Sequence, residues 1–513
     1  MENELFKIPC EKFFRFLFFK KGTVLTEKAT FFQKGFAPRP LKRIKEEKKM
    51  GKIRKRIDRK KGGGYSKYNN IFFRRNEKMK VGFGRIDVTP PIGVPLAGYF
   101  EPRTMVGVFD PLQLNAVVVE VGEDRLAIIT ADFLSMRETD CTGLRRLIEK
   151  ETGIPAQNIL TQCLHQHTSI FAGNSSGMPP YYKQSMERKY VDVVKYALDD
   201  LAEATVTVSE KETARPVSFI RRFRMKDGSV RTNPGFGNPD IDHPLGDADN
   251  TVRLVRFHRE GKGDIAMVGF QTHPDTIGGC RVSADWPGWV RRLTEKALEE
   301  EGVSCILVNG CQGDTNHFNV KGERPPKDHY EKFTKVSKGI AEEIVKVALA
   351  LWNEGKESPE GAISGEVTIH SIPTNLNGID RIEEAKALHK KVTAGEPTGL
   401  NMAEKGEVRR IAGMENHTLF QKVPVTMVAF GKIAVVGYGG EPFTEYADVL
   451  REAYPEMTIL TACNCNGAQG YLPSEKAFEE GGYEARTTVF TPSTPTVLQG
   501  EAKAKLARHI EKL

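Results

Sequence analysis

The sequence lacks an apolar run of the ~18 to 20 residues that a membrane-spanning helix needs. Its segment FFRFLFF (13–19) is shorter, and Lys and Arg interrupt and flank it, so a secretory leader is not predicted either. No internal repeat is present. The eight cysteines are scattered, and Cys463 and Cys465 are one residue apart rather than the two of a zinc knuckle. Several lie in apolar runs, which predicts buried, reduced thiols in a cytoplasmic protein.

The net charge of +8 is unevenly distributed along the 513 residues. Residues 1–78 contain 24 Lys and Arg against 8 Asp and Glu, whereas residues 79–513 contain 51 against 59. This predicts a disordered basic tail (1–78) and a mildly acidic body (79–513). The tail is interpreted as an extension upstream of a natural start near Met79, as a weak contact with an anionic surface, or as a targeting peptide. No stable nucleic-acid partner is expected.

From residue 80 onward, short apolar runs alternate with amphipathic helical segments. Strands are predicted at 115–121, 126–131, 158–163, 252–258, 265–272, 304–309, 424–430 and 433–437. Helices are predicted at 138–153, 181–203, 287–301 and 328–354, and from Pro442 onward. The alternation predicts an α/β fold in which a mixed β-sheet core is flanked by helices.

Polar side chains follow the ends of four predicted strands, where α/β folds usually place their sites. In chain order, these side chains are His165 and His167, His273 and Asp275, Asp314, and Glu441. A glycine-rich loop further on contains Tyr471 and Tyr483. Each residue alone is as typical of a turn, a helix start or packing as of a site. Together they predict a catalytic zinc site with two histidines, one carboxylate and an open position for water.

Eight motifs in this body resemble the catalytic domain of the neutral/alkaline ceramidase family, in the same order and over roughly residues 80–490. They are GRIDVTPPIGVPLAGY, LHQHTS, QTHPDTIGG, SADWPG, NGCQGDTN, GGEPF, NGAQGYLPS and GGYE. The resemblance implies a zinc-dependent hydrolase that cleaves an N-acyl amide bond with metal-activated water. It also implies a small-molecule substrate from sphingolipid metabolism or a more polar amide.

The resemblance further implies roles for individual residues. The zinc ligands would be His165, His273, Glu441 and, as a phenolic ligand, Tyr471. The candidate catalytic residues are His167, Tyr483 and Asp314. His167 and Tyr483 would face the substrate and donate hydrogen bonds, whereas Asp314, like Asp285, is expected to hold a loop rather than act as a base.

Two departures from the family narrow this expectation. Gly310 stands where ceramidases have a serine that they require for activity, and Cys311 is beside it. The chain also ends about thirty residues after Tyr483, where the family continues into an immunoglobulin-like domain. We therefore expect poor ceramidase activity and hydrolysis of a smaller or more polar amide. The alternatives are a zinc hydrolase of another amide or ester, and a non-catalytic metal-binding module whose basic tail binds nucleic acid or membrane.

Overall fold

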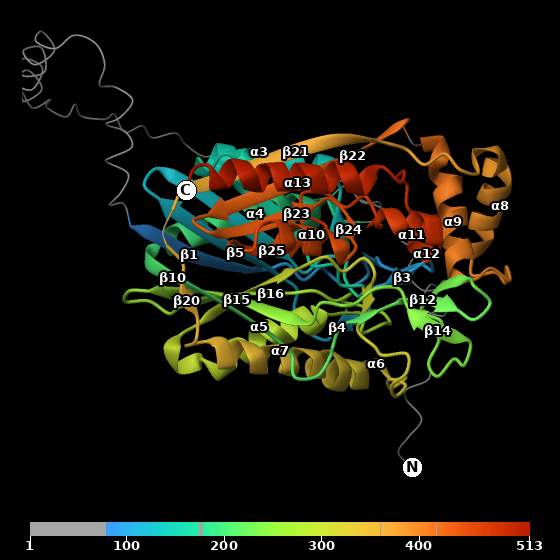
Figure 1. Cartoon of the computed structure of the whole chain (residues 1–513), viewed down its shortest axis with the longest axis horizontal. Helices are drawn as coiled ribbons and strands as arrows, with labels where there is room; N and C mark the ends of the chain where they lie inside the picture. The colour runs from blue at the N-terminus through green and yellow to red at the C-terminus, as the bar shows by residue number, and fades with distance from the viewer. Residues whose placement is uncertain (1–77, 174–177, 360, 417) are drawn as a thin grey trace, which may run out of the picture. The chain divides into compact units, whose positions relative to one another are not determined.

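The computed structural model of the chain describes residues 78–173, 178–359, 361–416 and 418–513 (Figure 1). Almost all of the predicted basic tail (1–78) lies outside the described residues. The division of the chain into tail and body, and the interpretations of the tail, therefore stay predictions.

Within the described residues, nine strands form the larger sheet, in the order β18-β16-β15-β10-β1-β5-β6-β8, with β20 paired to β10. Its strands are β1 (Met79–Asp87), β5 (Gln113–Val121), β6 (Asp124–Ala131), β8 (Ile159–Cys163), β10 (Ala202–Glu212), β15 (Thr251–Arg259), β16 (Ile265–Phe270), β18 (Ser304–Asn309) and β20 (Lys356–Glu357). The β16–β18 and β6–β8 pairs are parallel and the other pairs are antiparallel. The predicted mixed sheet is confirmed.

A second sheet has four strands among the described residues: β21 (Ile363–Pro373), β22 (Phe420–Phe430), β23 (Ile433–Tyr438) and β25 (Thr458–Ala462). It shares a hydrophobic core with the larger sheet, in which Val117 and Val119 of β5 join Val428 and Val435. The other face of β5 places Leu114 in a second core. Burial on both faces explains why this strand is an almost continuous apolar run in the sequence.

Helices cover the outer faces of both sheets (Figure 1). Over the larger sheet lie α3 (Glu138–Thr152), α4 (Pro180–Asp199), α5 (Asp285–Ala297) and α7 (Lys338–Leu351), and over the smaller sheet lie α10 (Glu445–Ala453) and α13 (Thr494–Ile510). Gly153 ends α3 in the left-handed conformation, with φ of 77°. The predicted helix at 328–354 comprises α6 (His329–Glu331), a π-helical turn (Lys332–Ser337) and α7.

Four helices that the sequence analysis did not predict lie together at one end of the body (Figure 1). They are α8 (Ile382–Thr393), α9 (Met402–Gly413), α11 (Glu475–Glu480) and α12 (Tyr483–Thr487). Two short strand pairs are β2 (Pro95–Leu96) with β3 (Arg103–Thr104), and β24 (Glu441–Pro442) with β26 (Tyr471–Leu472). The remaining strands are β4 (Gly107–Val108), β7 (Ser135–Met136), β9 (Phe171–Ala172), β11 (Phe219–Ile220), β12 (Arg222–Met225), β13 (Val230–Thr232), β14 (Ile241–Pro244), β17 (Arg281–Val282) and β19 (Thr315–Asn316).

The two edges of the larger sheet approach each other at the ends of β8 and β18. The Gln162 side chain on β8 donates to the Asn309 carbonyl at 2.6 Å, and the Asn309 amide donates to the Leu164 carbonyl at 3.1 Å. The segment after β25 joins this contact, because the Cys463 amide also donates to the Asn309 carbonyl at 3.0 Å. The residues that follow β8, β16, β18 and β23 are thereby brought to one place.

Candidate metal centre

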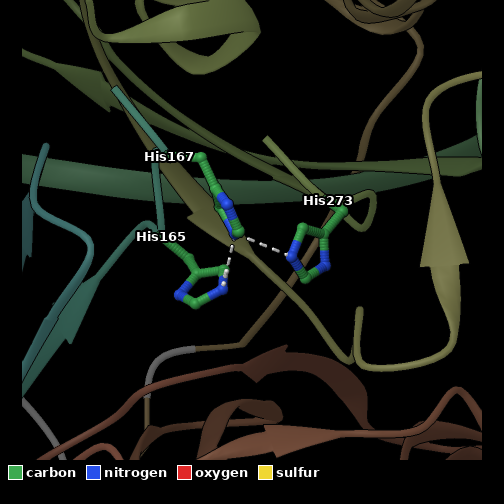
Figure 2. A group of neighbouring side chains, drawn as sticks. All are labelled: His165, His167 and His273. Atoms are coloured by element: carbon green, nitrogen blue, oxygen red, sulfur yellow. Dashed lines mark hydrogen bonds between the residues drawn. The ribbon is translucent and has the colours of Figure 1, made fainter. Parts of the chain in front are cut away.

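Three histidines from two loops bring their imidazole rings together (Figure 2). His165 and His167 directly follow β8, and His273 follows β16. Nε2 of His167 lies 3.2 Å from Nε2 of His165 and 3.0 Å from Nε2 of His273. Burial lowers the pKa of His167 and of His273, so both rings are neutral at pH 7 and offer lone pairs. The short distances show that the Nε2 atoms of all three histidines face one point.

The Glu441 carboxylate completes this cluster from the smaller sheet. Its Oε2 lies 3.2 Å from Nε2 of His165 and 3.9 Å from Nε2 of His273. This buried oxygen has no hydrogen-bond partner among the described residues. Burial alone would raise the pKa of Glu441, but His165 and Arg221 lower the pKa further than burial raises it. The side chain is thus an anionic, unsatisfied acceptor directed at the histidines.

The cluster has the dimensions of a zinc site. Ligand atoms bound tetrahedrally to zinc at about 2.0–2.1 Å lie about 3.3–3.4 Å apart. The separation of 3.2 Å between Glu441 and His165 is close to that value, and the 3.9 Å between Glu441 and His273 is longer. Nε2 of His167 lies at 3.0 and 3.2 Å from the other two imidazoles, which is also close. Neutral imidazoles and a carboxylate are also ligand types that zinc accepts. The residues present therefore fit a divalent metal ion.

Backbone carbonyls orient two of the three rings. Nδ1 of His165 lies 3.0 Å from the Leu134 carbonyl, and Nδ1 of His273 lies 3.4 Å from the Gln312 carbonyl. Because a carbonyl only accepts, the Leu134 contact favours hydrogen on Nδ1 of His165 and leaves its Nε2 free to bind a metal. Nδ1 of His273 also lies 3.5 Å from Arg221, which only donates, so its tautomer is not set by the carbonyl alone. The Asn464 side-chain amide also lies 2.9 Å from Nδ1 of His165, and its nitrogen and oxygen exchange places when the amide rotates.

His165 occupies a backbone conformation that non-glycine residues rarely adopt. Its φ is 78°, and Asn464 beside it has φ of 44°. Such conformations cost about 1–3 kcal/mol each and persist where the surroundings fix them. Here hydrogen bonds fix them, because the His165 amide donates to the Phe133 carbonyl and the Asn464 amide donates to the Gly440 carbonyl.

His167 is held differently from the other two histidines. Its buried Nδ1 has no hydrogen-bond partner among the described residues, and a carboxylate oxygen of Asp275 is 3.8 Å away. Its backbone carbonyl accepts a hydrogen bond of 2.6 Å from Arg103. The hairpin of β2 and β3 supplies that arginine and Tyr99, whose ring contacts the imidazole edge-on with centroids 5.6 Å apart. Tyr99 in turn donates to Asp275.

Arg221 connects the metal cluster with the two tyrosines. Its buried guanidinium donates to Glu484 and to the Gly313 carbonyl, each at 2.7 Å, and lies 3.5 Å from Nδ1 of His273. The guanidinium also lies over the Tyr471 ring, at 5.1 Å from the centroid. Tyr471 and Glu441 are register partners in the β24–β26 pair, which brings this tyrosine next to the cluster.

Tyr483 contacts Tyr471 edge-on, with ring centroids 5.5 Å apart. Burial raises the pKa of Tyr483 to about 12, so its phenol keeps its hydrogen at neutral pH. Burial also raises the pKa of Tyr471 well above its usual value. Without a metal, both side chains are therefore hydrogen-bond donors.

Asp314 and Asp285 hold loops. The Asp314 carboxylate accepts hydrogen bonds from the backbone amide and the hydroxyl of Thr444, both at 2.9 Å, and so ties the loop after β18 to the loop that contains Glu441. The Asp285 carboxylate accepts from the Thr276 amide at 3.0 Å and from the Ser337 hydroxyl at 3.0 Å. It thereby fixes the loop that follows His273. No contact between Asp314 and the histidine rings is found among the described residues.

A cavity of about 250 Å³ opens beside the cluster. His167, His273, Arg221, Tyr471 and Tyr483 form its inner wall, and residues of α9 and of the 98–100 segment complete it. The sequence-predicted residues His167, His273, Tyr471 and Tyr483 thus share one cavity. His165 and Glu441 lie behind them, and Asp314 is further back in the loop contact.

Gly310 does not face this cavity. A Cβ atom there would lie 2.9 Å from Oε1 of Gln271 and 3.0 Å from Oγ1 of Thr461, and Gly310 borders a separate space of about 10 Å³. A serine at this position would therefore direct its hydroxyl at Gln271 and Thr461 and away from the histidines. Burial raises the pKa of the neighbouring Cys311 to about 12, so this thiol is not a nucleophile.

No protein-family model matches the sequence, and no curated protein matches it. Solved structures do. The neutral ceramidase from Pseudomonas aeruginosa superposes with a TM-score of 0.63 at 15% identity, over 85% of this chain and 75% of that one. A structure described as ceramidase complexed with C2 gives 0.63 at 14% identity, over 85% and 76% of the two chains. The chain therefore has the fold of neutral ceramidases, as the motifs predicted.

Proposed function

We propose that this protein is a zinc-dependent hydrolase that cleaves an N-acyl amide bond. The observation that supports this most directly is the convergence of neutral imidazole nitrogens and an unsatisfied, buried carboxylate oxygen beside an open cavity. The likeness in fold to structures described as neutral ceramidase and as ceramidase supports the reaction class by analogy. We propose zinc as the metal from the ligand types alone.

We propose that His165, His273 and Glu441 are metal ligands and that His167 is not. The first two rings have a carbonyl acceptor behind Nδ1, which is the usual support of a ligating histidine, whereas His167 has none. Three protein ligands leave a coordination position open for water, and His167 as a third imidazole and fourth ligand would close it. Tyr471 adjoins Glu441 and is proposed as a further ligand that binds weakly or only in part of the reaction cycle.

When bound, the zinc ion would lower the pKa of a water molecule and polarise the amide carbonyl. His167 lines the cavity, and its ring is neutral because burial lowers its pKa. We propose that it accepts a proton at Nε2 and delivers it to the leaving nitrogen. Tyr483 keeps its phenolic hydrogen and donates it to the developing oxyanion. We propose Asp314 as a positioning residue, since it contacts Thr444.

The reaction consumes one water molecule. The carbon–nitrogen bond breaks, and the water oxygen forms a bond to the carbonyl carbon. Both water protons end on the leaving nitrogen, so the products are a carboxylate and an ammonium ion and no proton is released. No oxidant, reductant or further substrate is needed.

The test combines metal analysis with a hydrolysis screen of the full-length protein. We expect about one zinc per chain, and turnover of N-acyl substrates that a chelator abolishes and added zinc restores. The screen should include ceramide, short N-acyl amines and matching esters. If the protein is isolated without metal and also fails to bind added zinc, the metal site is refuted. Bound zinc with no turnover of any amide or ester would favour the non-catalytic alternative.

Among the described residues, no helix is both long enough and apolar enough to cross a lipid bilayer. The predicted cytoplasmic location, a sphingolipid substrate and contacts of the tail with anionic surfaces remain proposals. The side chains that line the cavity bear on the class of substrate.

A further inference from the structure

Helix α9 presents two basic side chains to the mouth of the cavity. Met402, Lys405 and Arg409 are spaced at i, i+3 and i+7, so they lie on one face of the helix, and all three line the cavity. Gly406 lets this face approach closely: a Cβ there would lie 2.8 Å from Cε2 of Tyr483. The basic face of α9 is thereby fixed next to the proposed catalytic tyrosine.

The charges of these two side chains are not neutralised by nearby carboxylates. Arg409 is exposed and has no ion pair among the described residues. Lys405 has a single carboxylate near it in the described part of the chain, the exposed Glu101 at 3.9 Å. Such an exposed and distant pair contributes little. Both cations are therefore available to a ligand.

The neighbouring arginines have structural partners instead. Arg410, the next residue after Arg409, is buried and donates to the carbonyls of Asn375, Asn377 and Arg486. Arg486 pairs with Glu407. Lys405 and Arg409, the two basic residues of α9 that line the cavity, are thus the two whose charges are available. The helix is therefore not simply a basic surface.

Of the other charged side chains that line the cavity, Arg221 is paired, and Asp275 is a single carboxylate against the two cations of α9. Arg221 pairs with Glu484, and the Asp275 carboxylate accepts a hydrogen bond from Tyr99. The remaining excess is positive and lies at the mouth. Among the lining residues, Phe100 and Met402 are the main apolar side chains, and the volume of about 250 Å³ is below the ~300–1,000 Å³ of pockets that enclose drug-sized ligands. A polar substrate group fits this surface better than two lipid chains.

We propose that the substrate of this site carries an anionic group, a carboxylate or a phosphate, which pairs with Lys405 and Arg409 while the amide lies at the metal cluster. This inference rests on the proposed amide hydrolysis and names the class of its substrate. The arginine fork suits either anion, and the lysine adds a second charge. The attraction also weakens with salt, since the mouth is open to solvent.

The experiment compares pairs of small substrates that differ only in charge. One pair is N-hexanoylglycine and N-hexanoylglycinamide, and the other is N-hexanoyl-O-phosphoethanolamine and N-hexanoylethanolamine. Zinc-loaded wild type, Lys405→Gln, Arg409→Gln and the double variant are assayed for kcat/KM. Lys391→Gln on α8 is the matched control, because Lys391 is exposed and does not line the cavity.

We expect wild type to prefer one charged member of a pair at least about tenfold, as a close ion pair worth about 1.4 kcal/mol would give. The double variant should lose that preference with little change for the neutral member, and Lys391→Gln should retain it. Which pair responds identifies the anion. Equal kcat/KM for both members in wild type, or the same response in the control, would overturn the proposal.

Calorimetric titration of the metal-depleted full-length protein separates this inference from the proposed function. Without metal there is no turnover, and the probes cannot bind through zinc. If no amide is hydrolysed but the charged probe still binds more tightly than its neutral partner, and the double variant abolishes this difference, the hydrolase proposal fails and the anion site remains. If charged and neutral probes bind equally, the anion site fails whatever the turnover shows.

Discussion

The floor and the mouth of the cavity are built on different principles. At the floor, His165, His273 and Glu441 follow strand ends and are buried, and backbone carbonyls or neighbouring loops orient them. At the mouth, Lys405 and Arg409 project from helix α9; Lys405 is half-buried and Arg409 is exposed to solvent. The floor is a fixed arrangement in which a small displacement alters the chemistry. The mouth tolerates substitution, and changes there alter the choice of substrate.

The largest effect is expected from removing the floor ligands. His165→Ala and His273→Ala should lower metal affinity by more than the 10- to 100-fold typical of losing a supporting residue, and should abolish hydrolysis. His167→Ala should keep the metal while kcat falls about 10²- to 10⁴-fold, as expected for a lost proton-transfer group. Elemental analysis and kinetics on the folded variants distinguish the two classes. If His167→Ala loses its metal, His167 is a ligand, and the inferred division into two ligating histidines and one non-ligating histidine is wrong.

A smaller effect is expected from a residue that supports the floor. Asp285→Ala leaves the Thr276 amide and the Ser337 hydroxyl without their acceptor, and buried unsatisfied groups cost about 1–3 kcal/mol each. We expect the free energy of unfolding to fall by about 2–4 kcal/mol in urea denaturation. Asp240→Ala, at an exposed position, is the control and should change stability by less than about 0.5 kcal/mol. Similar losses in both variants would show that Asp285 does not fix the loop.

The hairpin that borders His167 offers a paired test. Gly98 has φ of 105°, and a Cβ there would lie 3.0 Å from Cα and the carbonyl oxygen of His167, whereas Gly93, with φ of 95°, faces open space. Both Gly→Ala changes carry backbone strain of about 1–3 kcal/mol. Only Gly98→Ala should also lower kcat, with zinc content unchanged. Equal kinetic effects of the two variants would mean that the hairpin does not position His167.

The smallest effect is expected from Gly310→Ser. The new side chain would lie next to Gln271 and Thr461, outside the cavity. The end of the flexible Gln271 side chain would have to move to make room for it. We expect a destabilisation of about 1 kcal/mol, in line with mild overpacking, and no gain in ceramide hydrolysis. Appearance of ceramidase activity in this variant would show that the loop after β18 rearranges to bring position 310 into the cavity.

The sequence predicted the floor better than the mouth, for physical reasons. Strands β5, β8, β16 and β18 are apolar runs bounded by turns, and polar residues after such runs are visible without a structure. The approach of the two sheet edges was not predictable, because it depends on contacts such as that of Gln162 with Asn309, which are 147 positions apart. Arg221 was missed because it lies in a charge-rich stretch that is typical of an exposed strand. Its partner Glu484 is 263 positions away.

The mouth was missed for another reason. Met402, Lys405 and Arg409 lie on an amphipathic segment in which basic residues are ordinary for a solvent-exposed helix face. What makes two of them distinctive is their position over the cavity, which follows from the packing of Gly406 against Tyr483. Neither residue spacing nor charge indicates that contact.

The proposed metal ligands are divided between the two halves of the chain. His165 and His273 belong to the half that ends with β20, and Glu441 and Tyr471 belong to the half that begins with β21. Neither half alone carries the full proposed set, so tight zinc binding would require both sheets to be docked. By linkage, each tenfold excess of free zinc over its dissociation constant would oppose their separation by about 1.4 kcal/mol. The ion would thus act as a cross-link between the two sheets, and zinc uptake would report that they are docked.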